Sequence, residues 1–225
     1  MKLLLCAGTA IALSAAMATP ALAQVNGIGI TNPPAAIVGS RALADAYGRI
    51  NATYVTQITQ LQQTQQQRAQ LMQQFDTDRD GQLSEAETAA AQANTALVQQ
   101  LQTLNQTISE QEQPISLAQI YVVEQIAMQY GAALQQVITQ KNVQMILSPQ
   151  AVTYAPDEAV LTDDVIAALD QLLPTVSPTP PADWRPQQQS YEVWQNVQEI
   201  IATIQAMRQA QAAQEQPAAP AVQGR

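Results

Sequence analysis

Two long runs of helical periodicity, separated by a short polar segment, constrain the fold of this chain more than any other feature. The first run begins at Ser40, a predicted N-cap, and its seam advances by helical steps (Tyr47, Ile50, Tyr54, Leu61, Leu71 and Phe75). The second run carries a similar seam on both sides of Pro114 (Leu97, Leu101, Leu104, Ile108, Ile115, Val123, Ile126, Tyr130 and Val137). Such spacing places an apolar stripe on one helix face. We therefore expect an antiparallel helical hairpin that reverses at the polar segment and bends at Pro114.

The composition favours long, thinly packed helices over a thick core. The whole chain has one Phe and two Trp, only 12% of its residues are charged, and Gln and Ala recur throughout. The first seam is itself interrupted by Gln57, Thr64 and Arg68. A seam with polar gaps buries little apolar surface, so we expect a weakly packed and flexible pair of helices.

The polar segment between the two runs has the ligand spacing of a calcium loop, an EF-hand loop over residues 76–87. Its twelve positions supply three carboxylates, a backbone carbonyl, a water-mediated hydroxyl and a bidentate carboxylate, in that order (Asp76, Asp78, Asp80, Gln82, Ser84 and Glu87). Gly81 at position six allows the sharp turn. The alternative is a metal-free polar turn that reverses the helices. A turn alone needs neither Gly81 nor Glu87, so we favour a Ca2+ site.

The calcium loop has no partner, because no second sequence of this kind occurs in the chain. EF-hands usually brace each other in pairs, so a lone loop between mobile helices should bind weakly, in the range of about 10⁻⁴–10⁻³ M. We expect Ca2+ to stiffen the tip of the hairpin and to set the angle between the helices that leave it.

The N-terminus is typical of a secretory signal over residues 1–23. Lys2 precedes a short apolar stretch, and Ala21–Ala23 provides the small residues that a signal peptidase needs. A retained anchor is the alternative, but the stretch is shorter than the roughly 20 residues of a spanning helix. Cleavage would remove Cys6, the single cysteine, so we expect no disulfide, and no membrane span thereafter.

Short β segments lie near both ends of the hairpin. Residues 25–32 alternate like a strand, and Pro33–Pro34 should end it. Residues 143–155 predict a strand, a turn at Ser148–Pro149 and a second strand, and residues 161–173 predict a helix with Thr162 as its N-cap. The expected fold class is mainly α with a small β body, in which residues 24–39 and 141–175 form the body and residues 40–140 form the arm.

The remaining residues form an extension. We expect a proline-rich linker over residues 176–189, followed by a C-terminal helix and a disordered tail over residues 190–225. Trp184 and Trp194 flank this helix, and we expect them to pack it down rather than to bind a ligand.

Several function classes are disfavoured by what the chain lacks. It has no His, it would lose its only Cys with the signal, and it has neither a phosphate-binding glycine loop nor a nucleophile elbow, so we do not expect an enzyme. Without Lys2 the formal charge would be 8 − 18 = −10. An acidic chain of this kind is not expected to bind nucleic acid or to attach electrostatically to an anionic membrane.

The segment MILSPQAVTYAPDEAVLTDDVIAALDQLL, residues 145–173, resembles the closing segment of the Skp/OmpH family of periplasmic chaperones. The N-terminal GIGITN and the Gln- and Ala-rich arms are similar too, so the resemblance covers about residues 24–173. It implies a homotrimer in which the short strands pool into one body. It also implies that three arms enclose a cavity for unfolded outer-membrane proteins. Family members are often basic, whereas this chain is acidic and its outgoing arm carries few basic residues, among them Arg49, Arg68 and Arg79.

Together these features predict a periplasmic holdase chaperone that binds unfolded outer-membrane proteins, with an arm tip that responds to calcium. The alternative is a calcium-dependent coiled-coil sensor or scaffold protein of the cell envelope. A strand-forming body favours the chaperone, because a plain coiled-coil scaffold would not need one.

Overall fold

The computed structural model describes residues 27–82 and 84–215. The predicted signal at residues 1–23 and the tail after residue 215 lie outside the described residues. The elements follow the chain in this order: β1 (Ile28–Ile30), α1 (Pro33–Gly39), α2 (Arg41–Thr53), α3 (Val55–Gln73), α4 (Glu85–Ala93), α5 (Thr95–Lys141), β2 (Met145–Leu147), α6 (Thr162–Leu172) and α7 (Gln188–Glu215). The expected class, mainly α with a small β body, is confirmed. None of the helices in these described ranges is both long and apolar enough to cross a membrane.

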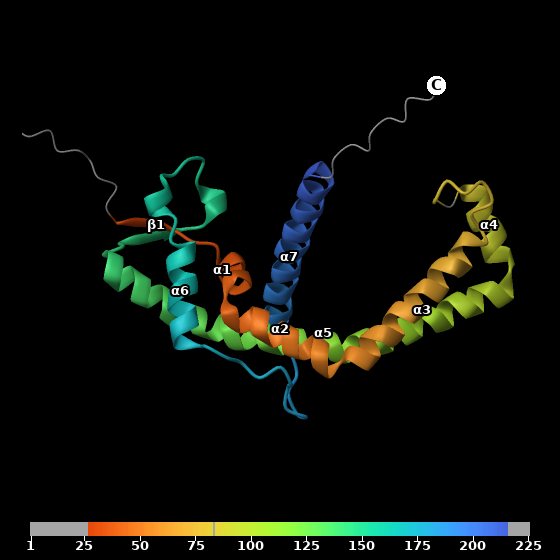
Figure 1. Cartoon of the computed structure of the whole chain (residues 1–225), viewed down its shortest axis with the longest axis horizontal. Coiled ribbons are helices and arrows are strands. Elements are labelled where there is room, and N and C mark those ends of the chain that lie inside the picture. The colour runs from red at the N-terminus through yellow and green to blue at the C-terminus, as the bar shows by residue number, and fades with distance from the viewer. Residues whose placement is uncertain (1–26, 83, 216–225) are drawn as a thin grey trace, which may run out of the picture.

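The predicted helical hairpin is present as a curved arm (Figure 1). Helices α2 and α3 lead out to the tip, and α4 and α5 return, with α3 packed along α5. The outgoing run, expected to be one helix, is broken at Tyr54 (φ −103°, ψ 19°). The returning part is broken at Asn94 (φ −91°, ψ 90°), just before its predicted seam begins at Leu97. Pro114 lies inside α5 as the sequence predicted.

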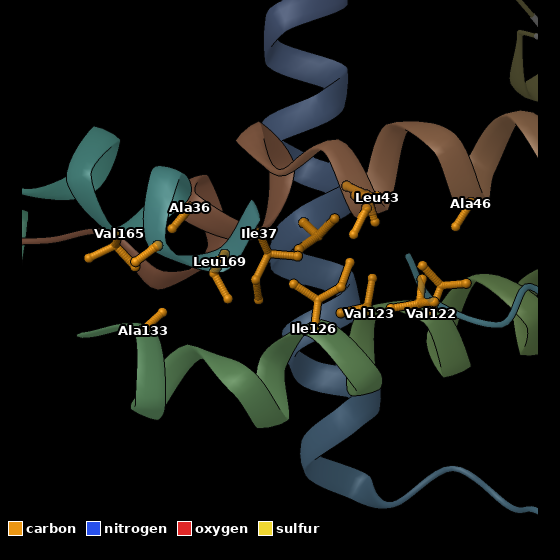
Figure 2. Packing of buried hydrophobic residues seen from close by; sticks show 14 of the residues in the cluster. Ala36, Ile37, Leu43, Ala46, Val122, Val123, Ile126, Ala133, Val165 and Leu169 are labelled. Atoms are coloured by element: carbon orange, nitrogen blue, oxygen red, sulfur yellow. The ribbon is translucent and has the colours of Figure 1, made fainter. Parts of the chain in front are cut away.

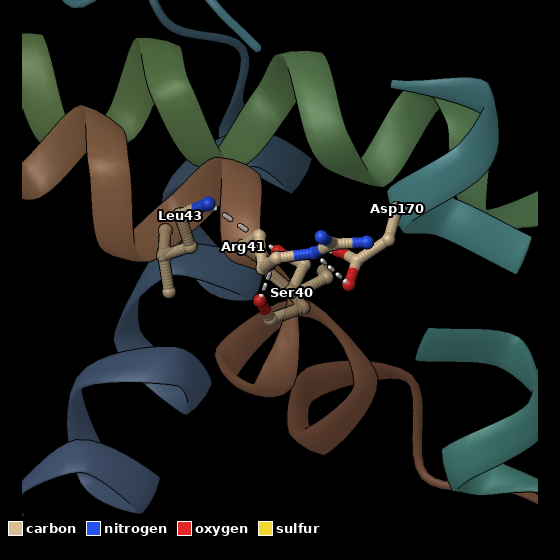
Figure 3. A network of polar contacts seen from close by, with 5 residues as sticks. Ser40, Arg41, Leu43 and Asp170 are labelled. Carbon is tan, nitrogen blue, oxygen red and sulfur yellow. Dashed lines mark hydrogen bonds and ion pairs between the residues drawn. The ribbon is translucent and has the colours of Figure 1, made fainter. Parts of the chain in front are cut away.

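The start of the arm is capped as expected, but a short helix precedes it. Ser40 is the N-cap of α2, and its Oγ accepts a hydrogen bond from the Leu43 backbone N–H at 3.3 Å. The same hydroxyl donates to the Ile37 carbonyl of α1 at 2.7 Å, so one side chain joins both helices (Figure 3). Pro33 was expected only to end a strand. It also begins α1, because an N–H group in the first turn of a helix has no acceptor within that helix, and proline therefore loses no hydrogen bond there.

The two ends of the arm meet in a parallel sheet of two three-residue strands. Ile28 pairs with Met145 and Ile30 with Leu147, which confirms the expected meeting of these distant segments. The predicted second strand after Pro149 is wrong: residues 149–151 form a 3₁₀ turn, and only an isolated bridge from Ile30 to Val160 extends the pairing. Proline cannot donate to a ladder, and its fixed φ suits the start of a turn.

Helix α6 is present, but its predicted N-cap is wrong. Thr162 is the first helical residue and Leu161 occupies the N-cap position, without a side-chain bond. The Thr162 hydroxyl instead accepts the Asn32 backbone N–H at 3.3 Å, and so links α6 to the turn after β1. Asp170 near the other end of α6 binds Arg41, with Nε to Oδ2 at 2.8 Å (Figure 3).

The core of the molecule lies where α1, α6 and α7 meet the parts of α2 and α5 that are farthest from the arm tip (Figure 2). Ile37, Ile126 and Leu169 come from three different helices and are at most 1% exposed. Burying a side chain of this size contributes about 1.5–3 kcal/mol. The body therefore holds most of the apolar stabilisation, and the arm extends from it.

The C-terminal extension packs on this body. Arg49 donates to the Val176 carbonyl at 2.6 Å, and Trp184 packs edge-on against Tyr121 with ring centroids 5.0 Å apart. The Trp184 indole N–H donates to Glu124 at 3.1 Å, and the Ser190 hydroxyl in the first turn of α7 donates to the same carboxylate. Trp194 packs against the core cluster. The expectation that both Trp side chains pack the last helix down is confirmed.

Candidate functional site

The residues of the predicted calcium loop form the turn between α3 and α4 at the arm tip (Figure 1). Carboxylate oxygens of Asp76, Asp78 and Asp80 lie within 4.8 Å of one another. Their oxygens also accept backbone N–H groups of the same turn: Asp76 from Gly81 at 2.9 Å, Asp78 from Asp80 at 3.2 Å and Asp80 from Gln82 at 2.7 Å. Gly81 has φ +83°, which only glycine adopts freely. This geometry directs three carboxylates towards one point.

Glu87 lies apart from this group of three carboxylates. Its Oε2 accepts the Ser84 backbone N–H at 2.9 Å and the Ser84 hydroxyl at 2.8 Å, which forms a capping box at the start of α4. Its Oε1 accepts the Thr77 backbone N–H and hydroxyl, each at 2.6 Å. Four donors therefore satisfy both of its oxygens, and Glu87 must leave them to bind a cation at the cluster.

The ionisation of the loop follows from these contacts. Hydrogen bonds from the Thr77 hydroxyl, then from the Ser84 backbone and hydroxyl and the Thr77 backbone, lower the pKa of Glu87 to about 2. At Asp78 the Asp80 N–H favours the charged form. Desolvation, the negative charges of Asp80 and Glu87, and a hydrogen bond with Asp76 together outweigh it, so the pKa of Asp78 is raised. Carboxylates that repel one another in this way are the hard-oxygen ligands that Ca2+ prefers, so the donor set fits the ion.

Below the loop, residues of α3, α4 and α5 line a small, open apolar hollow that the sequence did not predict. Its volume is about 190 Å³, and its lining is mainly apolar (Met72, Phe75, Ala91, Val98 and Leu101, with Thr88, Gln92, Gln102 and Asn105). Phe75, the only Phe of the chain, is 8% exposed. The heptad seams did place Phe75 and Leu101 on facing stripes, but a spacing does not reveal the gap between them.

The arm shaft is polar even where its helices touch. Thr64 is buried between α3 and α5, and the Gln111 side-chain oxygen is buried without a hydrogen-bond partner in the described structure. Gln65 donates across the pair to Glu112 at 3.3 Å. Helix α3 contains a single charged residue, Arg68. The shaft therefore presents amides and hydroxyls with few charges.

At the body end, the two-stranded sheet opens into a groove of about 950 Å³. Its lining includes β1, the end of β2 and the segment after it, among them Leu147, Val152 and Ala155. Several large apolar side chains here are exposed: Ile28 by 36%, Met145 by 55%, Val160 by 47% and Tyr154 by 85%. The second predicted strand belongs to the wall of this groove and forms no ladder within the described chain.

Comparison with known proteins gives one family match. The model of the family described as outer membrane protein (OmpH-like) matches residues 27–169. No curated protein matches. A solved structure described as a proposed outer membrane chaperone (OmpH-like), from Caulobacter crescentus CB15, is 19% identical and has a TM-score of 0.39. The likeness covers 74% of this chain and 94% of that one. The family match includes both strands and the whole arm and ends within α6, before the linker and α7 begin.

Proposed function

The chain belongs to the OmpH-like family, and on this basis we propose that it is a periplasmic chaperone that binds unfolded outer-membrane proteins and prevents their aggregation, without a catalytic role. The observation that carries this proposal is the curved arm, which projects from a packed body and offers a surface with few charges and small apolar sites. Many weak contacts on such a surface sum to useful binding, and binding of the unfolded state competes with aggregation by mass action.

We propose that the working form is a homotrimer. A two-stranded sheet is marginal in water, and here each strand has only three residues. Its neighbouring side chains Ile28, Met145 and Val160 are substantially exposed. Pairing between copies would cover these side chains and complete the ladder, and three arms would then surround one cavity.

We further propose that Ca2+ binds at the arm tip and modulates the arm. The three clustered aspartates supply ligands, and Glu87 would add two more oxygens after it leaves Thr77 and Ser84. Release of the capping box would free the first turn of α4. Helix α4 also lines the apolar hollow, through Thr88 and Ala91. Glu87 would give up four hydrogen bonds to become one ligand, which makes the free energy of Ca2+ binding less favourable. This agrees with the weak binding expected of a lone loop.

The chaperone proposal is tested by light scattering while a denatured outer-membrane β-barrel protein is diluted into buffer with the chain from Gln24 onward. Suppression with and without millimolar Ca2+ supports a holdase. Suppression only with Ca2+ makes the loop a switch. Met72→Gln should weaken suppression, because it places an amide in the apolar hollow, whereas the exposed Gln70→Ala is the matched control.

The calcium proposal has an independent readout in titration calorimetry. Wild type should give a Ca2+ heat with a dissociation constant of about 10⁻⁴–10⁻³ M, and Asp80→Asn and Glu87→Gln should reduce it. No heat in wild type would remove calcium from the proposal and leave the chaperone role intact. No suppression of aggregation in either condition, together with a normal Ca2+ heat, would instead favour the calcium-dependent sensor or scaffold.

A further inference from the structure

The outer half of α7 is a helix surface that the rest of the described chain leaves unused. Val197 belongs to the core cluster, and Val193, Trp194 and Ile201 pack against it. Beyond Ile201, every residue from 202 to 214 is exposed except Ile204, which is partly buried. Thirteen such residues extend about 20 Å at the helical rise. The packed half has already formed the first turns, so this extension avoids the cost of nucleation.

This outer half carries a seam of its own. Ile200, Ile204 and Met207 follow steps of four and three, the spacing that lets identical helices pack against one another. None of the three belongs to the core cluster, and Met207 is 60% exposed. Val193 and Val197 begin the same seam inside the body. The apolar stripe of α7 therefore starts against its own chain, continues through the partly buried Ile200 and Ile204, and ends at Met207, which is largely exposed.

The position of α7 indicates what covers the stripe. In Figure 1, β1 and the outer end of α7 both lie on one side of α5, and α7 rises inside the curve between the body and the arm tip. The side with β1 is also the side with the two-stranded sheet and the groove, where other copies must meet if the sheet is extended. The outer end of α7 and the two-stranded sheet therefore lie on the same side of α5.

Charge does not oppose such a meeting. Between residues 202 and 215 the only ionisable side chains are those of Arg208 and Glu215, so the segment has no net charge. The chain as a whole is strongly acidic, and most of its surface would repel a second copy. A neutral, periodic stripe on an acidic protein fits another copy of itself, whereas capture of an unfolded client does not require a heptad spacing.

We propose that the outer half of α7 packs against α7 of neighbouring copies in the oligomer and closes the body side of the space that the arms enclose. This inference rests on the proposed oligomer. The seam has only three apolar residues and is too short to hold copies together alone. Copies already joined through the sheet, however, present their α7 helices at a high effective concentration, where a weak seam suffices.

Disulfide crosslinking tests this packing, because the chain from Gln24 onward contains no cysteine. Met207→Cys places one thiol on the seam, and Gln209→Cys places one about 200° around the helix, as a matched control. Two cysteines bridge only when their Cα atoms approach within about 7 Å. Under mild oxidation, Met207→Cys should yield linked pairs at least about tenfold faster than Gln209→Cys, because the packed seam holds its thiols together.

Sedimentation velocity on wild type separates this inference from the proposal beneath it. An oligomer in which Met207→Cys links faster than Gln209→Cys supports the seam. An oligomer in which the two variants link at equal rates, or not at all, overturns the α7 packing and leaves the assembly intact. A monomer overturns both. If copies do not link and a stop after Ile201 abolishes suppression of aggregation, the stripe binds clients and the packing between copies is refuted.

Discussion

Replacing Val197 with alanine should release α7 from the body while the rest of the core stays folded. Val197 is fully buried and belongs to the cluster shared by α1, α5 and α7. The other apolar anchors of α7 (Val193, Trp194 and Ile201) are only partly buried, and further contacts are polar, such as Ser190 on Glu124 and Gln198 on the Tyr47 hydroxyl at 3.1 Å. A loss of apolar contact at Val197 therefore acts on the docking of α7 before it acts on the other helices.

The size of the effect follows from the buried surface. Val→Ala removes two methyl-sized groups at about 0.8 kcal/mol each, roughly 1.6 kcal/mol in transfer free energy. The cavity that remains adds a further cost, which gives about 1.5–3 kcal/mol in total. Since 1.4 kcal/mol is a factor of ten, the undocked population of α7 should rise roughly ten- to a hundredfold.

Hydrogen exchange read by mass spectrometry measures this change segment by segment. Peptides from α7 should exchange faster by that factor, whereas peptides around Val122 and Val123 in α5 should keep their protection, because their packing includes α1 and α2. The control is Gln195→Ala on the exposed face of α7. Equal loss of protection in α5 and α7 would mean that the extension is no separate unit, and unchanged exchange in α7 would refute the role of Val197.

Three further predictions concern the sheet and two titrating groups. Gly29→Ala should lower the free energy of unfolding, measured by denaturant titration, by about 1–3 kcal/mol. The added Cβ would lie too close to the buried Leu161 Cδ1 and 3.0 Å from Ile146 Cδ1. An unchanged free energy of unfolding would mean that Leu161 moves aside. Burial raises the pKa of Tyr47 to about 12, so its contribution to stability is complete below pH 10 and declines as the pH rises towards 12. In an alkaline titration, phenolate absorbance should rise together with the loss of helical circular dichroism. The pKa of Glu87 is lowered to about 2, so the α4 cap is complete above about pH 4.5 and is lost as the pH falls towards 2; carboxyl NMR with a transition near 4.5 would contradict the capping geometry.

The arm was predictable from the periodic spacing of apolar residues in its two helical runs. The pairing of its ends was predictable from the short strand-like segments that flank these runs. The break at Tyr54 was not. The Tyr54 N–H still bonds Ile50 O at 2.9 Å, and Ile58 N–H bonds Tyr54 O at 2.8 Å, so the helix changes direction with little disturbance of its hydrogen bonds. Asn94 did leave a signal, since its side chain caps Leu97 at 3.3 Å and Asn is a favoured N-cap.

At the arm tip the sequence predicted the aspartate cluster but not the present partners of Glu87. Asp76, Asp78 and Asp80 alternate along one turn, and spacing alone brings such side chains together. Ser84 and Glu87, however, satisfy two patterns at once, a calcium loop and a capping box. The Glu87 carboxylate binds either a cation or the four donors of Thr77 and Ser84. The sequence pattern does not show which of the two is favoured.

The parallel pairing of β1 with β2 also predicts an order of folding. Ile28 is among the first residues of the body to be synthesised, and its partner Met145 follows more than a hundred residues later. Arg41 likewise waits for Asp170, 129 residues further on. Closing so long a loop is slow unless the intervening chain is already compact, so we expect the arm to form first and to bring the two ends together. Until the arm has formed, the first strand would be a short apolar segment without its partner strand. The protein itself would then be exposed to the aggregation that we propose it prevents in other proteins.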